Sequence, residues 1–114
     1  MGALSDCWTE VANALDIAGV PNTTDPSKVR PGVALVDPPR IVTGRSGYMS
    51  DVEVDVTVPG IPPGTPTVVA ALLDQVDEIV TVYPVTTARH GVLSVNGQDL
   101  PAVIATIRLT ISRP

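Results

Sequence analysis

A chain of 114 residues has the length of one domain, and its net charge of -5 and pI near 4.5 make it acidic. This charge argues against a DNA-binding regulator, because binding nucleic acid phosphates needs clustered lysines and arginines. With 44% hydrophobic and 17% charged residues, the chain can bury a core and is not intrinsically disordered. Aromatic residues make up only 3%, so aliphatic side chains must build that core. This composition predicts a modestly stable subunit that gains stability by associating.

The cysteine content and the apolar runs bear on where the protein is found. Cys7 is the only cysteine, so no internal disulfide and no cysteine zinc cluster can form, which suits a reducing cytoplasm. The longest strongly apolar run, 68–73, is far shorter than the roughly 20 residues of a membrane-spanning helix. The first residues lack the basic and apolar regions of a secretory signal. We expect a soluble, untargeted chain with no membrane partner.

The first third of the chain predicts one helix and two short strands. Apolar residues recur at three- and four-residue steps over 4–18, which predicts an amphipathic helix that Gly19 ends. A turn-rich connector follows over 20–32, with room for one short strand. Short extended segments are predicted over 33–36 and 40–43, on either side of a break that contains two prolines.

The clearest strand of the sequence is predicted over 51–58, after a glycine-punctuated loop over 44–50. Valine alternates there with polar residues, and alternate side chains of a strand point to opposite faces of its sheet. Four valines are therefore expected on a buried face. The opposite, solvated face carries the three carboxylates of Asp51, Glu53 and Asp55.

A second helix is predicted over 66–80. Thr65 is a good N-cap, Pro66 suits the first helical position, and a broad apolar stripe runs along the segment. Strands are predicted after it over 85–87, 92–95 and 102–112. We interpret 89–91 as a turn between strands, and Asn96-Gly97 as a tight reversal.

These elements predict a single α+β domain over 1–114. Its expected architecture is a mostly antiparallel sheet of four to five strands with two helices packed on one face.

Few residues in this sequence point to catalysis or to a metal. His90 is the only histidine, and no nucleophile-elbow pattern accompanies it, so we interpret it as a solvated loop residue rather than part of a Ser-His-Asp arrangement. The carboxylates of Asp51, Glu53 and Asp55 are spaced about 7 Å apart along a strand, which favours a solvated face over a compact metal site. The segment with Gly44 and Gly47 does not contain the lysine that a phosphate-binding loop requires. We therefore expect no enzyme activity, no cofactor and no bound metal.

Two features favour contacts between proteins. Arginine outnumbers lysine six to one, and arginine is enriched at protein interfaces; a coding bias toward arginine is the alternative explanation. Tyr48 and Met49 stand in the glycine-punctuated loop, where they either fold back on the sheet or project toward a partner. The candidate interface residues are Arg30, Arg40, Arg45, Tyr48, Met49 and Arg89.

The order of these segments resembles the tail terminator proteins of long-tailed phages (siphovirus type) that infect actinobacteria. The resemblance covers nearly the full length and rests on turn and core residues with no chemical signature. In the first half it is carried by 4–8, 14–15, 19–21, 24–26, 30–33 and 38–40. In the second half it is carried by the acidic alternating strand, the Pro-Gly-rich turn, 72–74, 76–77 and 97–102.

The resemblance implies a structural subunit without catalytic activity. Such a subunit forms a six-membered ring on the end of the tail tube, stops tube growth and presents a surface for joining to the head. The implied partners are copies of itself, the tail tube protein and a head-tail connector protein. The implied location is the head-proximal end of the virion tail, after synthesis in the host cytoplasm. The resemblance gives Cys7 no role.

If Asp51, Glu53 and Asp55 line the lumen of the ring, their charge would keep passing DNA from binding. We also hypothesise that the loop with Tyr48 and Met49 docks on the tail tube. Two other functions remain open: another neck adaptor between head and tail, and a small ligand-binding or metal-binding domain that uses Asp51, Glu53 or His90.

Overall fold

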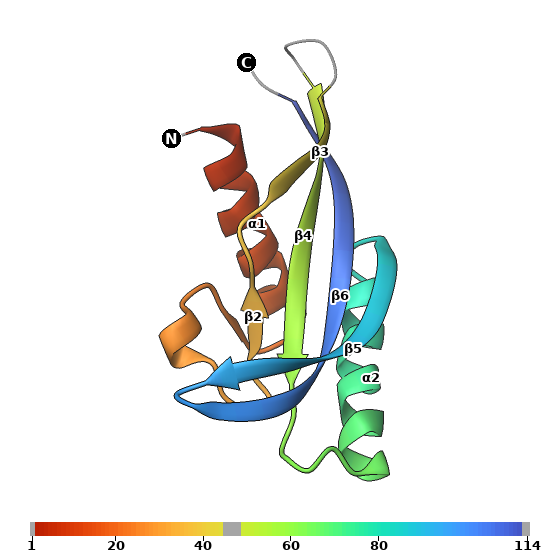
Figure 1. Ribbon diagram of the computed structural model, residues 1–114. Helices are drawn as coiled ribbons and strands as arrows, with labels where there is room; N and C mark the ends of the chain where they lie inside the picture. The colour runs from red at the N-terminus through yellow and green to blue at the C-terminus, as the bar shows by residue number, and fades with distance from the viewer. Residues whose placement is uncertain (1, 45–48, 113–114) are drawn as a thin grey trace.

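The computed structural model describes residues 2–44 and 49–112, and for Thr43 and Gly44 it describes the backbone alone (Figure 1). In chain order the elements are α1 (Ala3–Ile17), β1 (Asn22–Thr23), η1 (Pro26–Lys28), β2 (Ala34–Val36), β3 (Arg40–Gly44), β4 (Met49–Pro59), α2 (Pro66–Val80), β5 (Val85–Val95) and β6 (Gln98–Ser112).

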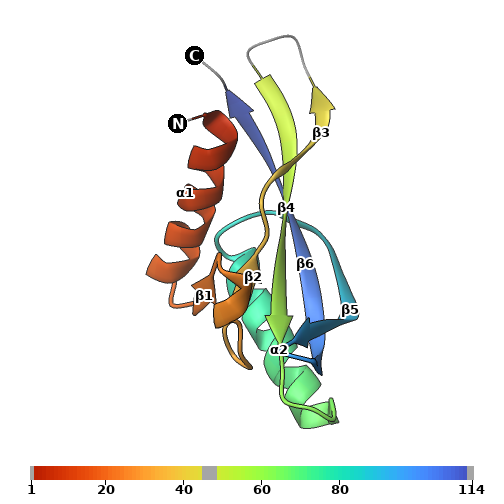
Figure 2. The same ribbon diagram turned by 60° about the vertical axis from the view of Figure 1, so that its left-hand side comes forward.

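The strands form one six-stranded sheet in the order β1-β2-β4-β6-β5, and β3 pairs with the part of β4 that β2 leaves free. All pairs are antiparallel except β1 with β2. Both helices lie on the same side of the sheet, while the hairpin of β5 and β6 bends toward the other side, the open face (Figures 1 and 2). The expected α+β class is confirmed. The sheet has one strand more than expected, and the short strand foreseen in the connector over 20–32 is β1, which forms an edge.

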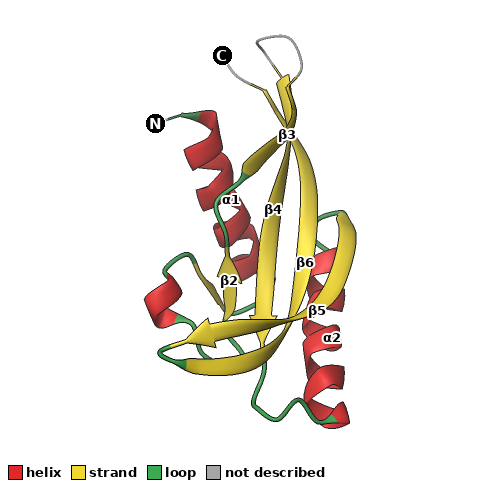
Figure 3. Cartoon of the chain, viewed as in Figure 1, coloured by secondary structure: helices red, strands yellow, loops and turns green. Residues whose placement is uncertain are grey.

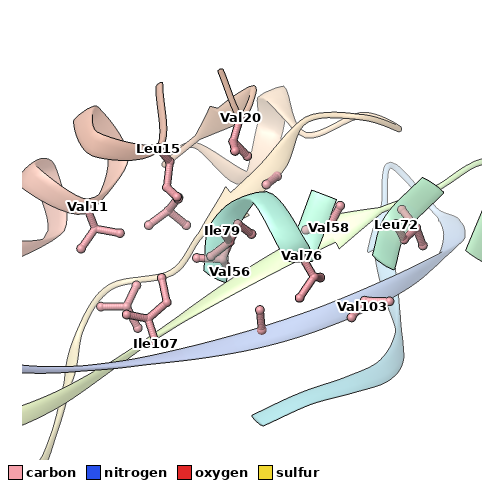
Figure 4. Close-up of a cluster of buried hydrophobic side chains, with 14 of the residues drawn as sticks. Val11, Leu15, Val20, Val56, Val58, Leu72, Val76, Ile79, Val103 and Ile107 are labelled. Carbon is pink, nitrogen blue, oxygen red and sulfur yellow. The ribbon is translucent and has the colours of Figure 1, made fainter. Parts of the chain in front are cut away.

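The core lies between the helices and the sheet (Figure 4). Helix α1 contributes one apolar stripe and α2 another, and the alternate valines of β4 face both. Each of these aliphatic side chains adds about 1.5–3 kcal/mol when fully buried. The indole Nε1 of Trp8 also donates a hydrogen bond to the carbonyl oxygen of Val36 at 2.9 Å, which ties α1 to β2.

The helix ends follow the predicted signals. Helix α2 spans Pro66–Val80 as predicted, and the hydroxyl of Thr65 accepts a hydrogen bond from the backbone N–H of Val68. Helix α1 begins and ends one residue earlier than predicted, and Gly19 after it has a φ of 85°. This left-handed conformation lets the chain leave the helix.

The predicted turn over 89–91 is wrong, because β5 runs without interruption through these residues (Figure 3). Gly91 pairs with Ala102 across the hairpin, and a Cβ at this glycine would lie 3.1 Å from the side chain of Ile104. The glycine therefore leaves room for an isoleucine on the neighbouring strand and does not form a turn. Strand β6 also begins earlier than predicted, at Gln98.

The reversal at Asn96-Gly97 is confirmed, with φ angles of 51° and 78°. Both central residues have positive φ, which is the requirement of the two-residue hairpin turn that this pair favours. A Cβ at Gly97 would meet no atom within 4 Å, so a substitution there changes only the backbone energy.

Gly97→Ala is accordingly expected to lower the free energy of unfolding by about 1 kcal/mol. Chemical denaturation of the two proteins measures the difference. Gly97→Asn is the matched control, because asparagine tolerates positive φ, and it should cost less. Equal stability of all three proteins would contradict this account of the turn.

Candidate assembly surfaces

Arg40 on β3 binds two of the three acidic side chains of β4. Its Nη1 lies 2.9 Å from Oδ2 of Asp55, and its Nη2 lies 2.9 Å from Oε1 of Glu53. The hydroxyl of Thr106 on β6 donates a further hydrogen bond to Asp55 at 2.7 Å. Arg40 was predicted as an interface residue. The structure places it within an internal ion-pair cluster on the open face, with its side chain 49% exposed.

Asp51 is held in the same way from the other side. The hydroxyl of Thr110 donates to its Oδ1 at 2.8 Å, and Nη2 of Arg108 lies 3.5 Å from its Oδ2. Only 7% of the Asp51 side chain is exposed. The prediction that this strand face is fully solvated is therefore wrong for Asp51, because β6 supplies hydrogen-bond donors that cover it.

The surroundings of Asp55 decide its pKa. Burial alone would raise it, but the hydrogen bond from Thr106 and the guanidinium of Arg40 together hold the pKa of Asp55 below its usual value. At Asp37, which stands just before β3, burial and the nearby charge of Asp55 raise the pKa. The ionised form of Asp55 thus stabilises the fold, whereas that of Asp37 opposes it.

Because the pKa of Asp55 is lower in the folded than in the unfolded state, its contribution is present above about pH 4 and is lost as the pH falls through the folded value. Asp55→Asn should therefore lower the melting temperature at pH 7 and should lose less stability than the wild type between pH 5 and pH 3. Melting curves across this range test the prediction. Parallel acid profiles would contradict it.

The other predicted interface residues are spread over the molecule. Arg30 follows η1, Met49 begins β4 and Arg89 lies in β5, and all three are exposed. Arg45 and Tyr48 lie outside the described residues, as does the center of the loop predicted to dock on the tail tube. Of the described members of this set, Arg40 and Arg89 both act on the carboxylate of Asp55, whereas Arg30 and Met49 lie on other segments.

Strand β5 forms an edge of the sheet that is uncovered on both faces. Residues 86–90 are all exposed, although their β6 neighbours Val103 and Ala105 are buried at 1% and 0% exposure. His90 pairs with Val103, so it is an exposed strand residue and not the loop residue that we predicted. The helix layer covers much of β6 but only the start of β5, where Val85 packs against the core.

An apolar groove of about 310 Å³ lies beside the first half of α2. Its lining includes Pro31, Gly60, Ile61, Val68, Ala71 and Leu72. Gly60 lets the chain pass close to the helix, since a Cβ there would lie 2.7 Å from the Val68 side chain. The sequence alone does not predict this groove, because it depends on how the turn after β4 meets a helix. Gly60, directly after Pro59, is the one local signal of this close approach.

The two helices carry negative charge only. Neither sequence contains lysine, arginine or histidine. The carboxylates of the two helices are all exposed and belong to Asp6, Glu10, Asp16, Asp74, Asp77 and Glu78. The described cations stand instead on the connector and on the strands, at Lys28, Arg30, Arg40, Arg89 and Arg108. Charge is thus unequally divided between the helix layer and the rest of the chain.

The described residues show no arrangement for metal chemistry. Across 2–44 and 49–112, no three or more His, Cys, Asp and Glu side chains are grouped so that they could hold a metal ion. Cys7 is buried against the core, and burial, with the nearby Glu10, raises the pKa of its thiol. A thiol in this state is a poor nucleophile. In the described part of the chain, no helix is long and apolar enough to span a membrane.

No protein-family model matches this chain, and no curated protein sequence matches it.

Proposed function

We propose that this chain is a structural subunit of a long-tailed phage, which forms a ring on the end of the tail tube, stops tube growth and joins the tail to the head. The resemblance of its segments to tail terminator proteins supports this function. The proposal includes no catalytic step. It requires that copies of the chain bind one another and that the assembled ring binds the tube.

The uncovered edge strand β5 is the observation that carries the proposal. A long edge strand presents unpaired N–H and C=O groups, and proteins usually protect such edges with proline, lysine, bulges or a covering element. β5 has 11 residues, contains neither proline nor lysine, and leaves 86–90 exposed on both faces; a register irregularity lies at its start, between Val85 and Thr87. A subunit whose edge is completed by its neighbours needs no further protection along the rest of the strand.

The unequal charge distribution supports association through two different surfaces. A closed ring forms when one surface of each subunit binds a different surface of the next. The helix layer is anionic, whereas the connector and β5 carry exposed cations. Opposite charges on the two surfaces would favour this head-to-tail contact over contact between like surfaces.

In the proposed ring the face of β4 with Asp51, Glu53 and Asp55 lines the lumen, but it does not repel DNA as strongly as the sequence suggests. The negative charge of these side chains is largely offset by cations. Arg40 lies against Glu53 and Asp55, and Arg108 lies against Asp51. The charge of Arg89 also lowers the pKa of Asp55. A lumen lined by this face would therefore neither bind DNA phosphates firmly nor repel them strongly. DNA passes such a surface without specific contacts.

The test is the length of the tail in phage particles that lack this chain. We expect tails of uncontrolled length without heads, and we expect uniform tails with heads when the wild-type gene is supplied from a plasmid. Electron microscopy of lysates measures both. The physical reason is that tube subunits continue to add when no ring closes the end.

Uniform tails of normal length that fail to join heads would contradict tube capping and would indicate the alternative function of a neck adaptor. Normal particles without the chain would remove the structural role altogether. A metal or metabolite that raises the melting temperature, with loss of the effect in His90→Ala, would support a ligand-binding domain instead.

A further inference from the structure

The apolar groove beside α2 and the end of α1 have complementary chemistry. Ile17, the last residue of α1, is 88% exposed, although a large aliphatic side chain is usually covered. The groove is lined mainly by apolar side chains and leaves Ile61 62% exposed. We infer that the C-terminal end of α1 of one copy, led by Ile17, docks in the α2 groove of a second copy.

The groove, of about 310 Å³, has room for water molecules that an aliphatic side chain can displace. Waters against an apolar wall find few hydrogen-bond partners, so their release by an aliphatic side chain favours binding. Ile17 is followed by Ala18, which is also exposed and small enough for the helix end to approach the groove closely.

The charges beside the α1 end and beside the groove also favour contact between these two surfaces. Asp16 stands next to Ile17, and the whole of α1 is anionic. The chain that enters the groove wall at Pro31 carries Arg30 directly before it and Lys28 two residues earlier, both exposed. Arg30 has no ion pair within the described residues, whereas the charge of Lys28 already acts on the neighbouring Asp25. An incoming α1 end would bring a carboxylate toward these cations as Ile17 enters the groove.

The helix end and the groove are different surfaces of the same chain. Contacts of this kind join copies head to tail, and they close into a ring when the rotation between copies allows it. The inference thus deepens the proposed ring and rests on it for closure, while the contact itself requires no tail tube.

Two single variants test the contact, one on each surface. Ile17→Asp removes the apolar side chain, and Ala71→Trp fills the groove from an exposed position on its wall. Both sites are exposed, so the melting temperature of the single chain should stay close to that of the wild type. Each variant alone is expected to lose self-association, with the dissociation constant raised about tenfold or more. Native mass spectrometry and sedimentation velocity measure the assembly state.

A mixture of the two variants gives the sharper result. The Ala71→Trp chain keeps its Ile17, and the Ile17→Asp chain keeps an open groove, so one intact contact is possible between unlike chains. We expect heterodimers in a one-to-one mixture and no larger assemblies. The matched controls are Ala70→Trp, which places the same ring on an exposed position outside the groove lining, and Asn13→Asp, which adds the same charge one turn earlier on α1. Both should assemble as the wild type does.

Wild-type assembly by both test variants would overturn the inference, and so would a wild-type chain that stays single at every concentration. If the wild-type chain assembles and the variants do not, but the assembly has no effect on tail tubes, the contact is supported and the proposed function is contradicted. If phages that carry either test variant form tails of normal length, the contact is contradicted while the proposed function stands.

Discussion

Ile107→Ala is expected to lower the free energy of unfolding by about 2–5 kcal/mol, which is a large share of the roughly 5–15 kcal/mol of a typical domain. Ile107 lies on β6 with 0% exposure, and it pairs with Val54 across the sheet beneath the helices. Truncation removes buried methyl groups and leaves a cavity that rigid neighbouring strands cannot fill. The melting temperature should fall by about 10 °C or more.

Ile17→Ala is the matched control for this core substitution, because it removes the same atoms from a side chain that is 88% exposed. Its effect on the single chain should stay within about 0.5 kcal/mol. Thermal and urea unfolding measure both variants at a concentration where the chain is not associated. A small effect at Ile107 would contradict the packing of the helices on β4 and β6.

Arg40→Met is expected to destabilise the chain by about 1–2 kcal/mol, even though the Arg40 side chain is 49% exposed. The substitution leaves Glu53 and Asp55 without their bound guanidinium, and their side chains are only 21% and 16% exposed. The pKa of Asp55 should rise, since Arg40 is one of the groups that hold it down. NMR titration of the Asp55 side chain detects this change directly.

The pH dependence separates the loss of charge from the loss of packing in Arg40→Met. As the pH falls through the lowered pKa of Asp55 in the folded wild type, the missing cation matters less, so the two proteins should differ less in stability at acid pH than at pH 7. Arg30→Met is the control, because Arg30 is exposed and has no ion pair in the described part of the chain. A loss of stability in Arg40→Met that is equal at both pH values would contradict the electrostatic account.

The helices could be predicted from sequence because their signals are local. Thr65 and Pro66 fix the start of α2, and a stripe of apolar residues at helical spacing sets its length. The alternating valines of β4 likewise predict both its strand conformation and its buried face. These signals require no knowledge of which segments meet in space.

The ion pairs and the uncovered edge could not be predicted in this way. Arg40 meets Glu53 and Asp55 only because β3 pairs with β4, and Arg108 reaches Asp51 only through the register of β4 with β6. The turn predicted over 89–91 failed for a related reason. Gly91 marks close contact with Ile104 on the adjacent strand, and a glycine in a sequence does not distinguish such a contact from a turn.

The proposed closure of the tail tube by copies of this chain can be observed on purified components. The purified protein is incubated with purified tail tubes, and the tube ends are imaged by electron microscopy with image averaging. We expect a ring of density at one end of each tube and tubes that no longer lengthen when tube protein is added. Bare tube ends that continue to grow in the presence of excess protein would contradict this closure.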